Sequence, residues 1–262
     1  MGLSLIFGIM RILQFAHGEV YMLGAYAIFY LSVTHGLSFS LAMLISMVVG
    51  VVLGLILERL FFRPLGGELL TTLMVALGLS IVLQASVTVG FGVSPKSIPS
   101  FAPHPTKILG IMLGSDRLIA VGVSIAMILL LYLFLKRSKY GQALTAAAQH
   151  REASLLMGIN PTQMAVIAMA IGSALATIAG SLMGSIFPIN PFMGGTALIK
   201  GLIIIILGGM GSLLGVVVGG LILGLIDGIA PVIFNAAVAA IAPLFIVTII
   251  LVLRPQGLFG HE

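Results

Sequence analysis

The chain has 262 residues, of which only 19 are charged: 12 Lys or Arg and 7 Asp or Glu. Hydrophobic residues make up 60% of it, and its mean hydropathy is +1.27. Nineteen charges cannot coat a soluble protein of this length, because soluble domains carry roughly 25% charged residues. The composition excludes an ordinary soluble enzyme, a disordered chain and a nucleic-acid binder, and it predicts a membrane protein whose outer surface contacts lipid.

The apolar runs are continuous, which predicts an all-α polytopic protein, since a β-barrel would show alternating segments of about ten residues. The chain has no cysteine, so disulfide and thiol chemistry are excluded. Polar segments separate about eight or nine transmembrane or half-membrane helices, over residues 2–15, 20–34, 37–57, 69–91, 118–135, 163–187, 197–210, 212–230 and 232–253.

Two of these runs are too short to cross a bilayer. Gly2–Phe15 would rise only about 21 Å as a helix, and Ala197–Met210 runs into the glycine-rich segment Gly208–Ser212. Short, glycine-broken segments in two halves of a chain indicate discontinuous helices at a transport site. An incomplete first span followed by an ordinary kinked helix would give the same pattern.

Basic residues predict the orientation, because cytoplasmic loops of membrane proteins carry an excess of Lys and Arg. Seven of them follow alternate spans and fit one cytoplasmic side: Arg59, Arg63, Lys136, Arg137, Lys139, Arg151 and Arg254. Alternation places the loop over 92–117 outside. Its four prolines disfavour helix, so it serves as a docking surface for an external partner or, more simply, as a connector.

Glycines recur every four residues in several spans, which places them on one face of each helix. The repeats are Gly50 and Gly54; Gly180 and Gly184; Gly211, Gly215 and Gly219; and Gly220, Gly224 and Gly228. A row of missing side chains lets a neighbouring backbone approach closely. The pattern predicts a tight helix bundle and by itself says nothing of transport.

Ionisable residues inside apolar spans are the next candidates. Arg11, His17 and Glu19 lie around a break in the first runs, whereas Lys200 and Asp227 each stand alone in a long apolar run. Each costs at least about 2.5 kcal/mol at the bilayer centre unless it is paired or hydrated. A pathway role is therefore predicted. The alternatives are a simple turn at the membrane interface for His17–Glu19 and a snorkelling side chain for Lys200.

The basic segment Arg137–Gln163 contains no run of membrane length. Ala143–Met157 is predicted to form a short amphipathic helix, which Gly158 can end and Asn160-Pro161 cannot continue. A helix that lies on the membrane surface between two spans is either a passive linker or the part through which a cytoplasmic motor moves the membrane domain.

Several motifs resemble a known family. EASLLMG (Glu152–Gly158) is similar to the EAA signature of bacterial ABC importer permeases, and FAHGEVYMLGAY (Phe15–Tyr26) to a segment of their branched-chain amino acid members. Further matching segments follow in the same order: Glu58–Leu65, Ile98–Phe101, Asn190–Gly215 and Leu253–Gly260. The resemblance covers essentially the whole chain and is closer to the smaller of the two Liv-type permease subunits.

The chain departs from the family pattern at a few positions. Gln14 stands where the family usually has Asn, Gln142 where it has Arg, and Ser154 where the signature has its second Ala. The segment Arg137–Gln163 is therefore less basic than the corresponding segment usually is in the family. The family normally has more of the first span before Gly2, so we expect this chain to begin within its first helix.

The resemblance implies a permease subunit of an ATP-binding-cassette importer for branched-chain or related amino acids, working by alternating access in the bacterial inner membrane. Implied partners are ATP-binding subunits, a second permease subunit and an extracytoplasmic binding protein. The chain has no GxxxxGK[ST] phosphate loop, so ATP and Mg²⁺ are expected in the partner subunits, and neither a cofactor nor enzyme activity here. Alternatives are a permease for urea or short amides, an ion-coupled secondary transporter, or a structural subunit.

We expect a single transmembrane domain over 1–262 with a coupling loop over 136–162. The resemblance assigns the coupling to the ATPase to Gly141, Glu152, Ala153, Ser154 and Gly158. Translocation-path candidates are Phe15, His17, Gly18, Glu19, Lys200, Gly208, Gly209, Gly211 and Asp227. Helix-packing candidates are Gly50, Gly54, Gly215, Gly219, Gly220 and Gly224. No metal site is predicted.

Overall fold

The computed structural model describes residues 1–10, 12, 14–65, 68–101, 106–108, 111–209, 211–233, 244–245, 247–248, 250, 252, 254 and 257–259. Among these residues, five helices are long and apolar enough to cross a membrane. They are α3 with its continuation (Phe39–Leu65), α4 (Leu69–Phe91), α5 (Ser115–Arg137), α8 (Pro161–Ile186) and α10 (Leu213–Ile233). The predicted all-α polytopic fold is confirmed, and the predicted span over 232–253 lies mostly outside the described residues.

Shorter elements complete the described chain: α1 (Gly2–Met10), α2 (His17–Phe29), α6 (Lys139–Gln149), α7 (Arg151–Leu156) and α9 (Met193–Gly208). Helix α2 continues as η1 (Tyr30–Thr34), and α3 continues through η2 (Glu58–Phe62) and η3 (Arg63–Leu65). Strands β1 (Thr106–Ile108) and β2 (Ile111–Leu113) pair antiparallel, with Lys107 opposite Met112.

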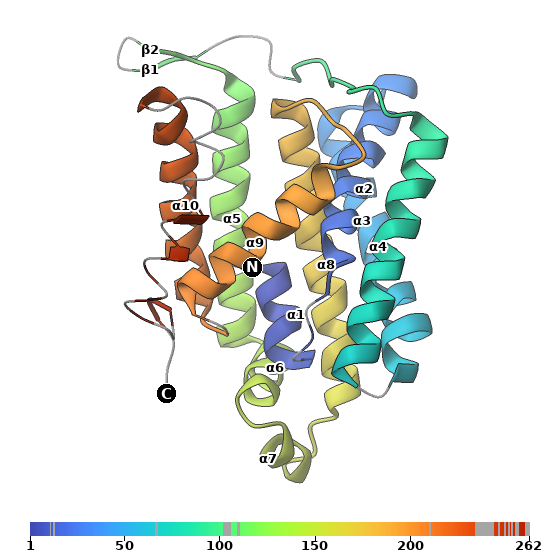
Figure 1. The fold of residues 1–262 in the computed structure, drawn as a ribbon, viewed down its shortest axis with the longest axis vertical. Coiled ribbons are helices and arrows are strands. Elements are labelled where there is room, and N and C mark those ends of the chain that lie inside the picture. Colours follow the sequence, from blue (N-terminus) through green and yellow to red (C-terminus); the bar gives the residue numbers. More distant parts are fainter. Residues whose placement is uncertain are drawn as a thin grey trace.

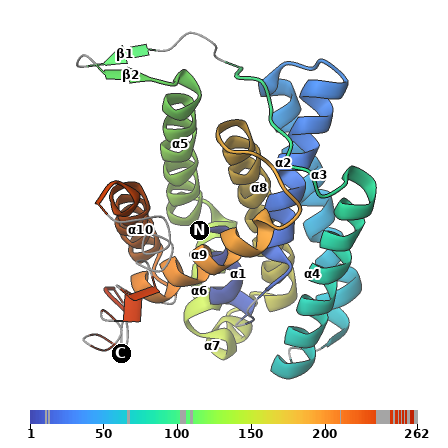
Figure 2. The ribbon, with the colours of Figure 1, turned by 45° about the horizontal axis from the view of Figure 1, so that its top comes forward.

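The long helices run between two ends of the molecule. The β1–β2 hairpin lies at one end, and α6 and α7 project from the other (Figure 1). Helix α9 crosses the bundle obliquely and joins the part that contains α2 and α8 to α10 (Figure 2). The β1–β2 hairpin and the α6–α7 segment therefore lie at opposite ends of the bundle.

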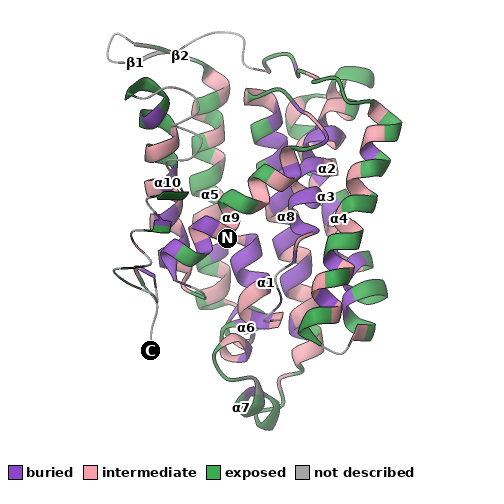
Figure 3. Cartoon of the chain, in the orientation of Figure 1, coloured by how far each residue is buried: buried purple, intermediate pink, exposed green. Residues whose placement is uncertain are grey.

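Helix α8 is the centre of the bundle, and α1, α2 and α3 all pack on it. Buried residues gather on α1, α2 and α8, whereas α4 and α5 carry few buried residues (Figure 3). Exposed apolar side chains on transmembrane helices are the surface that lipid covers. The core of the fold therefore lies along α8, and α4 and α5 are peripheral.

Small residues make this close packing possible. A Cβ at Gly180 would meet the backbone carbonyl of Tyr21, and Cβ atoms at Gly50 and Gly54 would meet the side chains of Thr177 and Ser173. Helices α2 and α3 thus approach α8 where side chains are absent, which is how membrane helices associate without a hydrophobic driving force between them.

The glycines of α10 divide into two groups. Gly215 lies against Gly208 of α9, and a Cβ at Gly219 would come within 2.9 Å of the Ile204 carbonyl oxygen. Gly220 and Gly224, by contrast, have no heavy atom of the described chain within 4 Å of the position that a Cβ would occupy. One glycine row packs on α9, whereas Gly220 of the other row lines a cavity with residues of α1, α5 and α9.

A buried polar cluster links three helices at the middle of the core. The carbonyl oxygen of Gly24 accepts hydrogen bonds from Ser181 Oγ at 3.1 Å and from Ser46 Oγ at 3.3 Å. The two hydroxyls lie 3.2 Å apart, and both side chains are fully buried. In a membrane these hydroxyls have no water to bond, so they fix the register of α2, α3 and α8.

Helix boundaries follow local chemistry. The side-chain oxygen of Asn160 accepts a hydrogen bond from the Thr162 backbone N–H at 3.0 Å, and Pro161 occupies the first position of α8. This is a favourable start, because proline lacks the N–H that the first turn leaves unpaired. Gly92 ends α4 with a φ of 78°, a conformation that favours glycine.

Candidate functional site

The first helix breaks inside the bundle between α1 and α2. Phe15 and Ala16 form a turn, in which the His17 backbone N–H donates to the Gln14 carbonyl oxygen at 3.1 Å. Helix α2 then begins at His17, and its first amides donate to the carbonyl of Ala16. The predicted break in this segment is present, and it places a set of polar side chains among buried helices.

Glu19 lies in the first turn of α2 and joins it to two other helices. Its side chain is 2% exposed, and Oε1 accepts a hydrogen bond from Ser80 Oγ of α4 at 3.0 Å. A Cβ at Gly194, in the first turn of α9, would lie 2.8 Å from the other carboxylate oxygen, Oε2. The carboxylate is therefore enclosed by α2, α4 and the start of α9.

The backbones of α2 and α9 touch at a pair of glycines. A Cβ at Gly18 would meet the carbonyl oxygen of Gly194, and a Cβ at Gly194 would lie 2.6 Å from the carbonyl oxygen of Gly18. Neither position has room for a side chain. The break therefore packs against the start of α9, a contact between residues that are far apart in the sequence.

Several buried polar atoms at the break have no hydrogen-bond partner in the described chain. They are both side-chain polar atoms of Gln14, His17 Nδ1 and Glu19 Oε2. Unpaired buried polar groups are rare and costly, at about 1–3 kcal/mol each. Four such atoms of the described residues therefore lie within six positions at the break.

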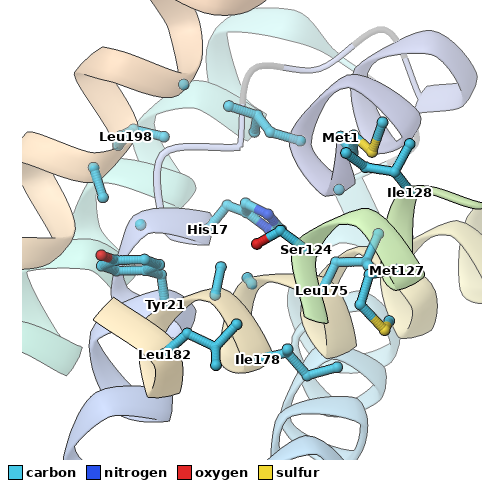
Figure 4. A pocket seen from close by; sticks show the side chains of 17 residues that line it. Met1, His17, Tyr21, Ser124, Met127, Ile128, Leu175, Ile178, Leu182 and Leu198 are labelled. Atoms are coloured by element: carbon cyan, nitrogen blue, oxygen red, sulfur yellow. The ribbon is translucent and has the colours of Figure 1, made fainter. Parts of the chain in front are cut away.

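A cavity of about 310 Å³ opens beside the break, between α1, α2, α5, α8 and α9. His17, Tyr21 and Ser124 contribute its polar groups, and Met127, Leu175, Ile178, Leu182 and Leu198 form apolar walls (Figure 4). Gly18 and the first residues of α1 also line it. Its size lies at the lower end of the range for small-molecule pockets, and its lining suits a small ligand with an apolar part.

The second predicted break lies at the other end of α9. Gly209 and Gly211 both have positive φ values, 95° and 89°, which favour glycine. The carbonyl oxygens of Leu207 and Gly208 accept hydrogen bonds from the backbone of Leu258, at 2.8 Å, and Phe259, at 3.1 Å. Gly208–Ser212 therefore contacts the described C-terminal residues, whereas Phe15–Glu19 contacts the opposite end of α9.

Lys200 and Asp227, each alone in its apolar run, form an ion pair. The Lys200 Nζ of α9 lies 2.6 Å from the Asp227 Oδ2 of α10. Their side chains are 52% and 32% exposed, respectively. Sequence alone could not join them, because they stand 27 positions apart and meet only through the packing of α9 against α10. The alternative of a snorkelling Lys200 did not include this partner.

The segment at the far end of the bundle is two helices rather than the single helix predicted over Ala143–Met157. The chain is extended at His150 (φ −140°, ψ 95°), where α6 ends and α7 begins. Ser138 starts α6, since its Oγ accepts a hydrogen bond from the Gly141 N–H at 2.8 Å. The extended residue lets α7 turn away from the bundle (Figure 1).

Helix α7 exposes apolar side chains at its end. Leu155, Leu156 and Met157 are exposed, with Leu156 at 90% and Met157 at 81%, whereas Ser154 is buried. Gly158 follows in a left-handed conformation (φ 79°), and Glu152 and Ala153 are exposed in the first turn. The resemblance drew attention to Glu152–Gly158, but it did not identify the exposed leucines and methionine as the outermost side chains.

Some features of the site were not predicted. Ser80 and Gly194 were not singled out, although both contact the break. Gly194-Gly195 is a glycine pair at the start of an apolar run, which is a usable signal for close backbone approach. Ser80 gave no signal, because a single serine in an apolar helix is common.

Long apolar helices, an interrupted first helix with polar groups and a helical segment outside the bundle define a polytopic membrane transport protein. Comparison with known proteins gives a narrower assignment. Residues 1–253 match the family described as branched-chain amino acid transport system / permease component, and the chain belongs to this family. The predicted family resemblance is confirmed.

The names of individual relatives agree with this family assignment. The high-affinity branched-chain amino acid transport system permease protein BraD of Pseudomonas aeruginosa is 32% identical, over 99% of this chain and 90% of that protein. LivH of Escherichia coli K12 is 29% identical, over 99% and 89%. The fructose import permease protein FrcC of Rhizobium meliloti is 30% identical over 40% of this chain and 31% of that protein. No solved structure matches the chain with significance.

Proposed function

We propose that this chain is a permease subunit of an ABC importer that carries branched-chain amino acids across the bacterial inner membrane. The names of the relatives with near-complete coverage support the substrate class. The observation that carries the coupling to an ATPase is α7, which projects from the bundle and exposes Leu155, Leu156 and Met157. Apolar side chains outside the bundle are expected to be covered by a partner.

The partner at α7 is a soluble ATP-binding subunit, which hydrolyses ATP with Mg²⁺. Glu152–Gly158 matches the EAA signature, and the three exposed apolar residues form the contact surface. Gly141 lets α6 pack closely on α5, since a Cβ there would meet the carbonyl of Phe134 at the end of α5. Movement of α7 would thus pass through α6 to α5, because α6 contacts both neighbours.

The path runs past the break at Phe15–Glu19. Its support is the cavity lined by His17 and Gly18, the buried Glu19 and the unpaired polar atoms. A discontinuous helix at this depth offers polar groups without placing lipid-exposed backbone in the membrane. The role of Gly208, Gly209 and Gly211 stays a prediction, and Gly209 and Gly211 lie between α9 and α10.

The α6–α7 end faces the cytoplasm. Lys136 and Arg137 end α5 at this side, and Arg59 and Arg63 follow α3, in agreement with the positive-inside rule. The hairpin β1–β2 and the loop after α4 then face outward, where a binding protein delivers the substrate. The predominantly apolar cavity lining favours an aliphatic side chain over the polar urea or short amides.

Reconstitution tests this proposal. The chain, its second permease and the ATP-binding subunits are placed in liposomes, and leucine uptake is measured with the binding protein outside and ATP inside. We expect uptake that requires ATP and competes with isoleucine and valine. The variant Leu156→Glu should abolish it, and Leu156→Met should preserve it. Uptake driven by an ion gradient without ATPase subunits, or competition by urea alone, would contradict the proposal.

A further inference from the structure

Helix α6 packs directly on α1. Leu144 of α6 is 1% exposed and lies in one cluster with Leu5 and Ile9 of α1. Helix α1 ends at Met10, and the break at Phe15–Glu19 follows within a few residues. The helix that precedes α7 therefore touches the half-helix that leads into the break.

A cavity of about 130 Å³ lies at this contact, separate from the cavity beside the break. Thr145 and Ala148 line it from α6, Gly8 lines it from α1, and Gly211 and Leu213 line it where α9 is linked to α10. Protein interiors hold few voids larger than a water molecule. This void therefore leaves α6 and its neighbours room to shift against one another.

Helix α1 is held unequally along its length. A Cβ at Gly2 would lie 2.7 Å from the carbonyl oxygen of Gly172 on α8, and a Cβ at Gly172 would lie 2.6 Å from Cδ1 of Ile6. Near the cavity, by contrast, a Cβ at Gly8 would meet the Ala148 Cβ at 3.8 Å, which is an ordinary contact distance. The start of α1 is thus fixed on α8, whereas the part near Gly8 has room to move.

Gly211 belongs to this cavity rather than to the one beside the break. The described residues of Gly208–Ser212 do not line the cavity beside the break. Helix α9 runs from this segment back to Gly194, where its backbone touches that of Gly18. The cavity at α6 therefore adjoins both elements that reach the break, α1 directly and α9 at its far end.

We propose that α6 transmits the movement of α7 to the break by shifting into this cavity, so that α1 swings about its fixed start. Gly8, Ala148 and Gly211 are then positioning residues for transport, because their small size keeps the space open. This inference rests on the proposed function, in which an ATP-binding subunit moves α7. It assigns Gly211 to the coupling route instead of the translocation path.

A reversible cross-link between α1 and α6 tests this role. The chain has no cysteine, and the Cβ positions at 8 and 148 lie 3.8 Å apart, a separation typical of disulfides. The variant Gly8→Cys/Ala148→Cys is reconstituted with the partner subunits, and mass spectrometry verifies its disulfide. We expect oxidation to lower ATP-driven leucine uptake at least tenfold and reduction to restore it. Undiminished uptake by the oxidised transporter would overturn the inference.

The two single-cysteine variants, Gly8→Cys and Ala148→Cys, control for the oxidant because neither can form this bond. Oxidation should leave the uptake of each unchanged. An equal loss of uptake in the single and double variants would also overturn the inference, since the effect would then not come from joining α1 to α6.

A packing variant tests the cavity without a cross-link. Ala148→Leu fills it from α6, whereas Ala146→Leu places the same side chain on a different face of that helix. We expect leucine imported per ATP hydrolysed to fall at least tenfold for Ala148→Leu and to stay near the unmodified ratio for Ala146→Leu. A merely structural effect would lower uptake and hydrolysis together, and equal ratios in both variants would overturn the inference. ATP-driven uptake by the unmodified transporter would leave the proposed function standing in that case.

Discussion

Gly18 and Gly194 form the tightest contact at the break, and each is needed because the other backbone occupies its side-chain space. This contact holds the start of α2 against the start of α9. Glu19 strengthens the same junction through Ser80. The junction therefore requires glycine at positions 18 and 194 and a buried carboxylate at Glu19. We expect single substitutions there to have large effects on stability that can be measured one at a time.

Gly18→Leu is expected to separate α2 from α9. Overpacking of a filled site costs about 1–3 kcal/mol, so the melting temperature of the detergent-purified protein should fall and uptake should be lost. Gly195→Leu is the matched control, since no heavy atom lies within 4 Å of its Cβ position. Its melting temperature and uptake should remain near those of the unmodified protein. An equal loss in both variants would contradict the close contact.

Ser80→Ala removes the donor to Glu19 and leaves a buried carboxylate oxygen unpaired. The expected loss of stability is about 1–3 kcal/mol, measured by thermal unfolding of the purified protein. Ser86→Ala on the same helix removes a hydroxyl that bonds only its own helix, at the Val82 carbonyl oxygen. It should change the unfolding midpoint little, and a similar change in both variants would count against the Ser80–Glu19 bond.

The part of the site that sequence could not predict is the set of contacts between residues that lie far apart in the chain. The break at Phe15–Glu19 could be predicted because polar residues interrupt an apolar run. The Ser80–Glu19 bond and the Lys200–Asp227 pair could not, since they join residues 61 and 27 positions apart. Such contacts depend on how the helices are arranged, and hydrophobic periodicity carries no information about that arrangement.

Helices with clear boundaries were predicted closely. The predicted spans 69–91 and 163–187 correspond to α4 and α8, because Gly92 and Asn160-Pro161 mark their ends. Helix α9 begins at Met193, four residues earlier than predicted. Asn190 explains the difference, since its side-chain oxygen accepts a hydrogen bond from the Phe192 N–H at 2.9 Å and prepares the helix start. The extended residue His150 was missed because its sequence neighbours all favour helix.

The end of α7 gives a prediction for the coupling segment. Gly158→Asp should abolish ATP-driven uptake, because Gly158 adopts a φ of 79°, where side chains are strained, and because the new charge lies beside the proposed contact. Insertion into the membrane should be normal on immunoblots. Gly158→Asn is the comparison variant, because Asn tolerates this conformation better than other non-glycine residues. This variant should retain part of the uptake. Normal uptake by Gly158→Asp would refute the coupling assignment.

At the scale of the whole molecule, the break and α7 lie in different parts of the bundle and must be linked for transport. Alternating access predicts that the break is reached by water in at least one nucleotide state. The chain has no cysteine, so single cysteines can report on this without background.

His17→Cys should react with a small hydrophilic thiol reagent, and its rate should change when ATP is added to the assembled transporter. Ser181→Cys is the control, because this side chain is fully buried in the cluster with Ser46 and Gly24. It should be unreactive in every state. If His17→Cys is also unreactive with and without nucleotide, the break is buried packing and the path lies elsewhere.

The position of α8 in the chain has a consequence for how the protein is made. Helices α1, α2 and α3 all pack on α8, yet α4, the outer loop and α5 to α7 are synthesised in between. The first helices therefore reach the membrane before their common partner exists, with their glycine faces uncovered. Assembly of the core must wait for Ile186 to leave the ribosome, so the nascent chain depends on the insertion machinery to shield its early helices until then.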